Sequence, residues 1–479
     1  MGRVSARERM LLPALVLATT TGAVVSSLGA PLVAEVAETE HLSVADAQWT
    51  LTAALLAGAV AVPILGRLAD GPRRRAVLLG SIAVAVVGTL IAALPLGFGG
   101  ILVGRLLQGI ALGSTPVAIA VARATLPAER HASALALLSV SVVAGAGLGY
   151  PIASLVATVG GLAAAYWFGF AASTVALVVA AVVVPRTAGA GATARVDWPG
   201  AVLLSIGSSA LLLVITQGET WGWLSPAVLG SLVIAVVALV LFARRSLRVP
   251  EPLLDLRFAV RRGVLGANLV ALVAGIGVYL LLSLVVLVAQ APLAQGGLAQ
   301  SVFVAGLLMV PYSAASLAGS RLNLLVARRL APDLLLPIGC AFYTAALLVV
   351  ALAHDQVWML ALSMLLAGLG SGSSFAAMPG LVLRHAAPRD SGSAVSANQL
   401  LRNIGFATGS ALTSGILVLF VAPGGVHPDP AAFTVAPLVG AGLLALGMVV
   451  SLVLAIGEVR AGRARNDPDE PEDPAALEL

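Results

Sequence analysis

The sequence has no lysine, a single cysteine and few charged residues of either sign. All 27 basic residues are arginines, and only 10% of the 479 residues are charged, whereas a soluble domain has about a quarter. At the same time 59% of the residues are hydrophobic and the mean hydropathy is +1.03. This composition excludes a soluble enzyme and a disordered chain, because no soluble arrangement could hide so much apolar surface. The sequence predicts an all-α polytopic membrane protein.

The missing residue types also exclude several kinds of site. The only cysteine, Cys340, rules out an internal disulfide and a cysteine metal cluster. The five histidines lie in or beside loops far apart in the sequence, so we expect no metal and no cofactor. Nucleotide-binding fingerprints are absent, and no continuous basic stripe accompanies the net charge of +5. Enzymatic activity, ATP-driven transport by this chain alone and nucleic-acid binding are therefore not expected.

Long apolar runs fill most of the chain, and each approaches the length of about 20 residues that a bilayer requires. We count fourteen, at about 11–34, 46–66, 76–96, 99–122, 134–156, 161–184, 199–216, 226–243, 264–289, 301–320, 333–353, 357–380, 395–420 and 433–456. Arginines fall in alternate loops, whereas the intervening loops contain no arginine and carry acidic residues, a pattern that predicts cytoplasmic amino and carboxyl termini. Arginine in place of all lysine, together with abundant alanine and valine, is typical of a GC-rich bacterial gene. We therefore expect a bacterial inner (cytoplasmic) membrane protein.

The apolar runs divide into two sets of six with a pair between them. Residues 11–184 and 263–456 are expected to form two six-helix halves, each built of inverted repeats. Residues 185–262 would supply a linker, two extra transmembrane helices and a cytoplasmic loop. Residues 1–10 form the expected cytoplasmic amino terminus, and the acidic residues 457–479 an expected disordered cytoplasmic tail.

The first motif follows the second apolar run and reads Gly66-Arg67-Leu68-Ala69-Asp70-Gly71-Pro72-Arg73-Arg74-Arg75. These residues predict a tight cytoplasmic turn in which Asp70 offsets a helix end or pairs with nearby arginines. The order G-x-L-x-D before three arginines resembles the loop signature of the major facilitator superfamily, with Arg73 in place of its second glycine. The resemblance implies a conformational-switch loop carried by Gly66, Asp70, Arg73, Arg74 and Arg75. The alternative is an ordinary positively charged loop.

The fourth apolar run contains an arginine at membrane depth. Leu102, Arg105, Gln108 and Gly109 are spaced like the l-x-x-x-R-x-x-q-G motif of the same superfamily. A guanidinium inside a membrane helix is costly unless it is paired or hydrated, so Arg105 is expected to have a function. The alternative is a structural arginine that donates to carbonyl groups of a neighbouring helix.

Further motifs resemble the fourteen-helix drug:proton antiporter family of that superfamily. In the fifth run Gly145, Gly147, Gly149 and Pro151 partly match its antiporter motif, and plain helix packing is the alternative. The other matching sequences are Gln48-Trp49-Thr50-Leu51-Thr52, Asp197-Trp198-Pro199-Gly200, Gln217-Gly218 with Trp221-Gly222-Trp223, Pro250-Glu251-Pro252-Leu253-Leu254-Asp255-Leu256, and Asn398 with Arg402, Asn403, Ile404 and Gly405. The resemblance covers residues 11 to about 456 and implies the major facilitator fold.

The aspartate that this family usually has in its first helix is missing. Gly22 stands at the matching position, and none of the fourteen runs has an acidic residue in its interior. The nearest acids by depth are Glu35 and Glu38, just beyond the outer end of the first run, and Asp46 at the start of the second run is next. We expect Glu35 or Glu38, with Asp46 as the further candidate, to pair with Arg105 and to couple protons. The alternative is that all three are surface acids placed by the topology.

Polar and aromatic residues near mid-membrane are the candidates for the substrate cavity, because they would orient cargo in an apolar chamber. They are Thr20, Ser26, Ser27, Gln108, Tyr279, Tyr312, Asn398 and Gln399. For the serines and threonines among them the alternative is helix packing. A chamber with almost no fixed charge suits bulky apolar or amphipathic cargo and argues against sugars, phosphates and amino acids.

These features predict a secondary active exporter of amphipathic or hydrophobic small molecules, such as drugs, antibiotics or metabolites, driven by proton antiport through alternating access. The alternative is a lipid or hydrophobic-metabolite transporter of the same fold with weak or no proton coupling, which the missing aspartate favours. The expected partners are the small-molecule substrate, protons and membrane lipids, and the expected state is a monomer.

Overall fold

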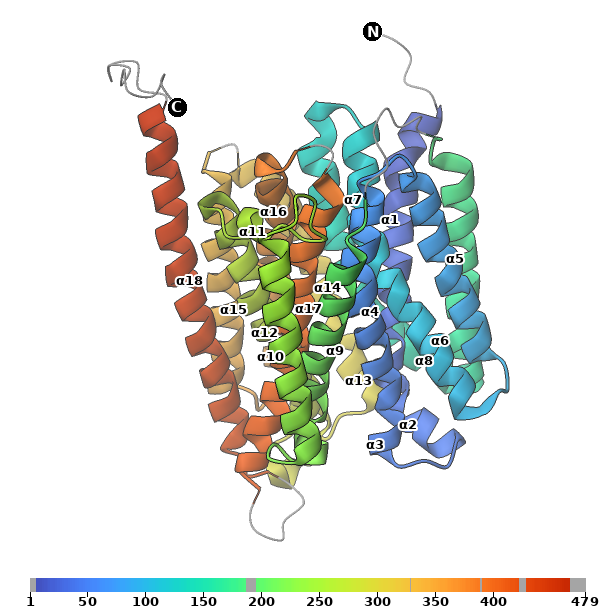
Figure 1. The fold of residues 1–479 in the computed structure, drawn as a ribbon. Helices are drawn as coiled ribbons and strands as arrows, with labels where there is room; N and C mark the ends of the chain where they lie inside the picture. The colour runs from blue at the N-terminus through green and yellow to red at the C-terminus, as the bar shows by residue number, and fades with distance from the viewer. Residues whose placement is uncertain (1–5, 187–194, 328, 388–389, 422–427, 466–479) are drawn as a thin grey trace.

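The computed structural model describes residues 6–186, 195–327, 329–387, 390–421 and 428–465. Within these ranges every regular element is a helix, and most of the helices run side by side along one direction (Figure 1). The predicted all-α class is confirmed. The central part of the predicted linker and the end of the predicted acidic tail lie outside the described ranges, as do the first five residues.

The first group of helices runs from α1 to α8. Its elements are α1 (Ala6–Ser27), α2 (Gly29–Thr39), α3 (Val44–Ala47), α4 (Trp49–Ala69), α5 (Arg74–Ala93), α6 (Gly97–Ile110), the 3₁₀ turn η1 (Ala111–Gly113), α7 (Ser114–Thr125) and α8 (Ala128–Val183). The first predicted run is divided into α1 and α2 at Leu28. The fourth is divided by η1 into α6 and α7, which together form one candidate membrane span.

α8 contains the fifth and sixth predicted runs in one element of 56 residues. A straight helix of that length would measure about 84 Å, roughly twice the thickness of a membrane. The helix is broken at Gly161, whose φ of +71° and ψ of −175° are readily adopted only by glycine. The two runs therefore meet at this glycine, where the chain turns without a separate loop.

The second group of helices, α12 to α18, follows a pair formed by α9 and α10. The elements after α8 are α9 (Trp198–Trp221), α10 (Pro226–Ser246), α11 (Leu256–Ala259), α12 (Arg262–Gln290), η2 (Leu293–Gln295), α13 (Val302–Leu307), α14 (Met309–Val326), η3 (Pro332–Leu334), α15 (Leu335–Leu352), α16 (Val357–His385), α17 (Ser391–Leu419) and α18 (Ala432–Arg465). The last helix continues beyond the predicted end of its run at 456, through the first part of the predicted tail.

Twelve helices of the described chain are long and apolar enough to cross a membrane, which confirms a multi-pass membrane protein. The twelve count α8 once, although it is broken at Gly161. They do not include α17, which has 29 residues but carries Asn398, Gln399, Arg402 and Asn403 within its length. The number of fourteen crossings stays a prediction.

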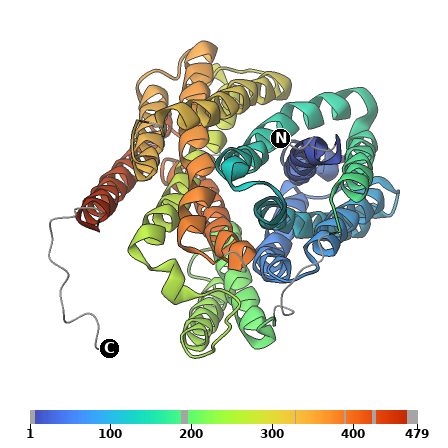
Figure 2. The ribbon, with the colours of Figure 1, turned by 90° about the horizontal axis from the view of Figure 1, so that it is seen from above.

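The two groups lie next to each other, and the pair α9–α10 lies beside both (Figure 2). An apolar cluster that includes Ala59 of α4, Leu204 of α9 and Leu400 of α17 joins the pair to each group. Gln217 of α9 also donates a hydrogen bond to Thr52 of α4, at 3.5 Å. The first turn of α1 and the last turn of α18 lie at the same end of the bundle (Figure 1), which we call the terminal end.

Candidate functional site

The loop motif at the end of α4 joins the two groups of helices at the terminal end. Asp70 follows the last residue of α4 and is 8% exposed. Its carboxylate accepts hydrogen bonds from the backbone N–H groups of Gly392, at 2.6 Å, and Ser393, at 3.2 Å, in the first turn of α17. A helix amino terminus carries unpaired N–H groups and partial positive charge, so it is a favourable partner for a carboxylate. Burial nevertheless dominates and raises the pKa of Asp70 to about 6.

Two arginines outside the predicted set strengthen this contact. Arg67 is buried and lies 3.6 Å from the carboxylate of Asp70 and 3.3 Å from that of Asp390. Arg123, in the last turn of α7, donates to the hydroxyl of Ser391 at 2.9 Å and to the carbonyl oxygen of Leu383 at 2.9 Å. We call Asp70, Arg67 and Arg123, with their partners on α16 and α17, the terminal-end lock. The position of Arg123 at the end of a predicted run was the sequence signal for it.

The glycine of the motif permits the close approach that the lock requires. A Cβ atom added to Gly66 would lie 2.6 Å from the Cβ and the Oγ of Ser396 on α17, closer than two such atoms can come. On the α17 side, a Cβ on Gly392 would overlap the carbonyl oxygen of Gly66. Side chains at either position would therefore hold α4 and α17 apart.

The three consecutive arginines of the motif lie elsewhere. Arg73 is exposed and precedes α5. Arg74 donates to the carbonyl oxygen of Ala69 at 2.8 Å, and Arg75 donates to that of Val184 at 2.9 Å. Arg74 and Arg75 thus satisfy the free carbonyl groups at the ends of α4 and α8, and they connect helices within the first group only.

Arg105 is fully buried in α6, and each of its three nitrogens donates to an acceptor. Nε donates to the carbonyl oxygen of Thr50 at 3.1 Å, Nη1 to that of Val25 at 3.1 Å and Nη2 to that of Ser26 at 2.9 Å. Nη1 also donates to Oε1 of Gln108 at 2.6 Å. This geometry is that of the alternative interpretation, in which the arginine ties neighbouring helices together through their carbonyl groups.

The three acids considered as partners of Arg105 lie apart from it. Glu35 lies beside Gly161 at the break in α8, and Glu38 is exposed. Asp46 is exposed and accepts a hydrogen bond from the hydroxyl of Ser43 at 2.6 Å. Among the residues that the structure describes, no ion pair joins Arg105 to any acid. Their role in proton coupling remains a prediction.

The small residues of α8 let this helix approach α1 and α14 closely. A Cβ on Gly145 would lie 2.8 Å from the carbonyl oxygen of Thr20, and one on Gly149 would lie 3.1 Å from Val24. Gly147 faces α14 instead, where an added Cβ would lie 3.2 Å from the ring of Tyr312. Pro151, two residues after Gly149, is buried and lies against Gly306 of α13. The motif thus packs α8 against α1 of its own group and against α13 and α14 of the second group. An antiport role for the motif stays a prediction.

The second group contains a buried arginine that the sequence reasoning named only as part of a motif. Arg402 of α17 is 3% exposed, and its guanidinium lies 5.1 Å from the ring centre of Phe375 and 5.8 Å from that of Phe406. Its Nη2 donates to Oε1 of Gln399, while its buried Nε has no hydrogen-bond partner in the described structure. A fixed positive charge therefore lies where we expected almost none.

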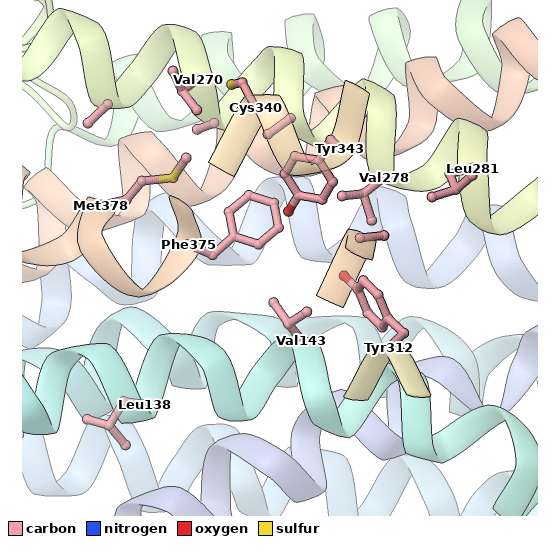
Figure 3. Close-up of a cluster of buried hydrophobic side chains, with 14 of the residues drawn as sticks. Leu138, Val143, Val270, Val278, Leu281, Tyr312, Cys340, Tyr343, Phe375 and Met378 are labelled. Atoms are coloured by element: carbon pink, nitrogen blue, oxygen red, sulfur yellow. The ribbon is translucent and has the colours of Figure 1, made fainter. Parts of the chain in front are cut away.

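Three buried tyrosines lie near the same guanidinium. Tyr279, Tyr312 and Tyr343 are close enough to interact with it electrostatically. Tyr279 stacks on Phe406 at a ring-centre distance of 4.4 Å. Tyr312 and Tyr343 come from different helices and meet at the hydroxyl of Ser371, at 2.7 Å and 2.8 Å. Tyr343 lies beside Phe375, with ring centres 6.3 Å apart (Figure 3). We use the name Arg402 cluster for Arg402 and the side chains around it, which are Tyr279, Tyr312, Tyr343, Ser371, Phe375, Gln399 and Phe406.

The predicted cavity residues thus fall into separate places. Gln108 lies at Arg105, and Tyr279, Tyr312 and Gln399 belong to the Arg402 cluster. The remaining four make contacts typical of helix packing. Ser26 and Ser27 donate to carbonyl groups of their own helix, Thr20 lies against Gly145, and Asn398 donates to the carbonyl oxygen of Ala267.

Comparison with known proteins assigns this arrangement to a family. The model of the Major Facilitator Superfamily matches residues 14–410. The chain belongs to the major facilitator superfamily. The solved structure of the human organic anion transporter MFSD10 has a TM-score of 0.62 over 94% of this chain and 100% of that chain, at 14% identity, a likeness that shows the fold alone.

The curated relatives of this major facilitator protein are transporters and resistance proteins, not enzymes. An uncharacterised transporter of the superfamily from Mycobacterium tuberculosis is 30% identical over 242 residues, which cover 49% of this chain and 34% of that protein. The methylenomycin A resistance protein of Bacillus subtilis is 26% identical over 391 residues, which cover 81% of this chain and 82% of that protein. The chain thus matches about a third of the first relative and most of the second.

Proposed function

We propose that the protein exports amphipathic or hydrophobic small molecules across a bacterial cytoplasmic membrane by alternating access. The observation that carries this proposal is the terminal-end lock, in which Asp70 and Arg123 of the first group bind α16 and α17 of the second. These contacts are polar bonds at one end of the boundary between the two groups, beside a buried apolar cluster that also crosses it. Polar bonds of this kind can break and re-form as the groups rock, which alternating access requires.

Drugs and antibiotics are the proposed cargo. A resistance protein such as that for methylenomycin A, at 26% identity over most of both chains, supports this class. The interior of the described helices is apolar and has few charges, which suits amphipathic molecules better than sugars or phosphates. The amino and carboxyl termini would lie in the cytoplasm, because the alternation of loops puts the arginine-rich loops and both termini on the same side of the membrane.

Proton antiport is the proposed driving reaction, and transport of lipids or hydrophobic metabolites without tight coupling is the second candidate. The second candidate is favoured by one observation, because Arg105 is satisfied by carbonyl groups and pairs with no acid in the described part of the chain. Asp70 supports coupling, because it is buried in the lock, with a pKa raised to about 6, and would be exposed when the lock opens.

Purified protein in liposomes loaded with a lipophilic dye separates these candidates. A pH gradient of either sign is imposed, and dye movement and internal pH are followed together. Dye flux that reverses with the gradient, accompanied by protons moving the opposite way, is expected for antiport. Flux that ignores the gradient would support the lipid or metabolite transporter, and an absence of dye flux in either condition would refute export of such molecules.

A further inference from the structure

Arg402 carries a charge that the described structure does not neutralise. A guanidinium stays protonated under all ordinary conditions. No ion pair of the described residues includes Arg402, and the acids within the described helices from α12 to α18 are Asp333 in η3 and Glu458 in the last third of α18. A buried cation is stable in a membrane protein only with partners, so residues of this kind usually mark a pathway or a binding site.

The contrast with Arg105 indicates which kind of partner is missing. Arg105 is equally buried, yet all three of its nitrogens donate to oxygen atoms of the protein. In Arg402 the buried Nε has no acceptor, and the bond that Nη2 makes is to the neutral amide of Gln399. Arg105 is therefore complete without a ligand, whereas Arg402 has a donor that is free to bind an anion.

The surroundings of Arg402 would fit a ring system. The guanidinium lies over the rings of Phe375 and Phe406, and Tyr279 stacks on Phe406, so the charge is set among aromatic rings. Flat aromatic molecules pack well on such rings. The cluster also borders the first group of helices, since Ser139 of α8 donates to the carbonyl oxygen of Phe375 at 2.6 Å. Separation of α8 from α16 would therefore open a way to it.

We propose that the Arg402 cluster is a binding site for the acidic group of amphipathic aromatic anions, in which a carboxylate or sulfonate oxygen accepts a hydrogen bond from Nε of Arg402. The ring system of the same molecule packs on Phe375 and Phe406. This inference rests on the proposed export function and narrows its substrate class, because it predicts a preference for acids over neutral or cationic molecules of equal size.

The test compares three molecules that share a naphthalene ring and differ in charge. One carries a sulfonate, one a hydroxymethyl group and one a trimethylammonium group, so that none changes charge between pH 5 and pH 9. Binding of each to the full-length protein in a neutral detergent is measured by equilibrium dialysis, and transport of each is measured in liposomes. The variants are Arg402→Gln, Arg402→Lys and, as a matched loss of one arginine, Arg321→Gln at the exposed end of α14.

The sulfonate is expected to bind about 10–100-fold more tightly than the alcohol, as a charge-assisted hydrogen bond would produce. Arg402→Gln should remove that difference and leave binding of the alcohol unchanged, Arg402→Lys should retain part of it, and Arg321→Gln should retain all of it. A purely structural Arg402 would change the thermal stability of the variants but not the order of the three ligands.

Two other results of this test would refute different parts of the proposal. If the protein binds and transports the alcohol or the ammonium compound as well as the sulfonate, or if Arg402→Gln and Arg402→Lys fold and still prefer the sulfonate, the anion site is refuted and the export function stands. If none of the three is bound or transported by the unaltered protein, the export function itself fails, and the anion site with it.

Discussion

The carboxylate of Asp70 accepts a hydrogen bond from the backbone N–H of Gly392 at 2.6 Å, across 322 positions of the sequence. This bond links the end of α4 to the start of α17 and so fixes the relative position of the two groups of helices. The bond needs the carboxylate of Asp70, and on the other side it needs a partner without a side chain, since a Cβ at Gly392 would overlap the carbonyl oxygen of Gly66.

Removal of this carboxylate should open the terminal end. Asp70→Ala deletes the acceptor of two hydrogen bonds and leaves Arg67 without a buried partner, which we expect to cost the closed arrangement about 1–3 kcal/mol. The closed population should fall about 5–150-fold relative to the open one. Distances between labels on cysteines placed at the exposed positions Ala76 and Ala387 would measure this. An unchanged distance distribution would contradict the role of the lock.

The same lock should close more tightly in acid. Asp70 has a pKa of about 6 in the buried position, compared with about 3.9 for a free carboxyl group. Since the closed state binds the proton more strongly, its stability is greatest at low pH and is lost as the pH rises through 6. The ratio of closed to open protein should rise about tenfold from pH 7 to pH 5. The labelled pair would report it, and the dependence should be absent in Asp70→Asn.

Close packing of α12 on α17 should make Gly409 sensitive to a single methyl group. A Cβ at Gly409 would overlap the carbonyl group of Ile276, whereas one at Gly415 on the same helix would meet nothing within 4 Å. Gly409→Ala should therefore destabilise the protein by about 1–3 kcal/mol, and Gly415→Ala should be neutral or slightly stabilising. Thermal unfolding of the two variants in detergent is the measurement, and equal midpoints would argue against the observed helix crossing.

Replacement of Arg105 should lower the stability of the folded protein more than it changes proton coupling. Arg105→Gln removes bonds to Thr50, Val25 and Ser26 and is expected to cost about 2–4 kcal/mol. A double-mutant cycle with Glu38→Gln should be additive within about 0.5 kcal/mol, because the two residues are not paired. A larger coupling free energy would restore Glu38 as the partner of Arg105.

The fold could be predicted further than the site. Apolar runs and arginine spacing gave the membrane helices, because lipid leaves the backbone few other choices. The break at Gly161 within α8, by contrast, depends on the backbone conformation of one glycine. The motif predicts that Asp70 belongs to a conformational-switch loop, but its partner Gly392 could not be predicted, since no local pattern records which helix ends meet.

The Arg402 cluster illustrates the same limit. Arg402 was recognised as one residue of a motif, yet its partners Phe375, Tyr312 and Tyr343 are carried by three other helices. Serines and asparagines were weighed as cavity residues by polarity alone. Polarity does not distinguish a side chain that donates to its own helix, such as Ser26, from one that is free to meet a ligand.

The attachment of α9 bears on how the molecule moves. Gln217 of α9 donates a hydrogen bond to Thr52 of α4, and the ring centres of Trp221, at the end of α9, and Trp49 of α4 lie 6.2 Å apart. The contact of α9 with α17 runs through the apolar cluster of Leu204 and Leu400. Apolar surfaces can slide without losing directional bonds, so the pair α9–α10 should move together with the first group. Its apolar surface would then slide along α17 and keep lipid tails out of the boundary between the two groups throughout the transport cycle.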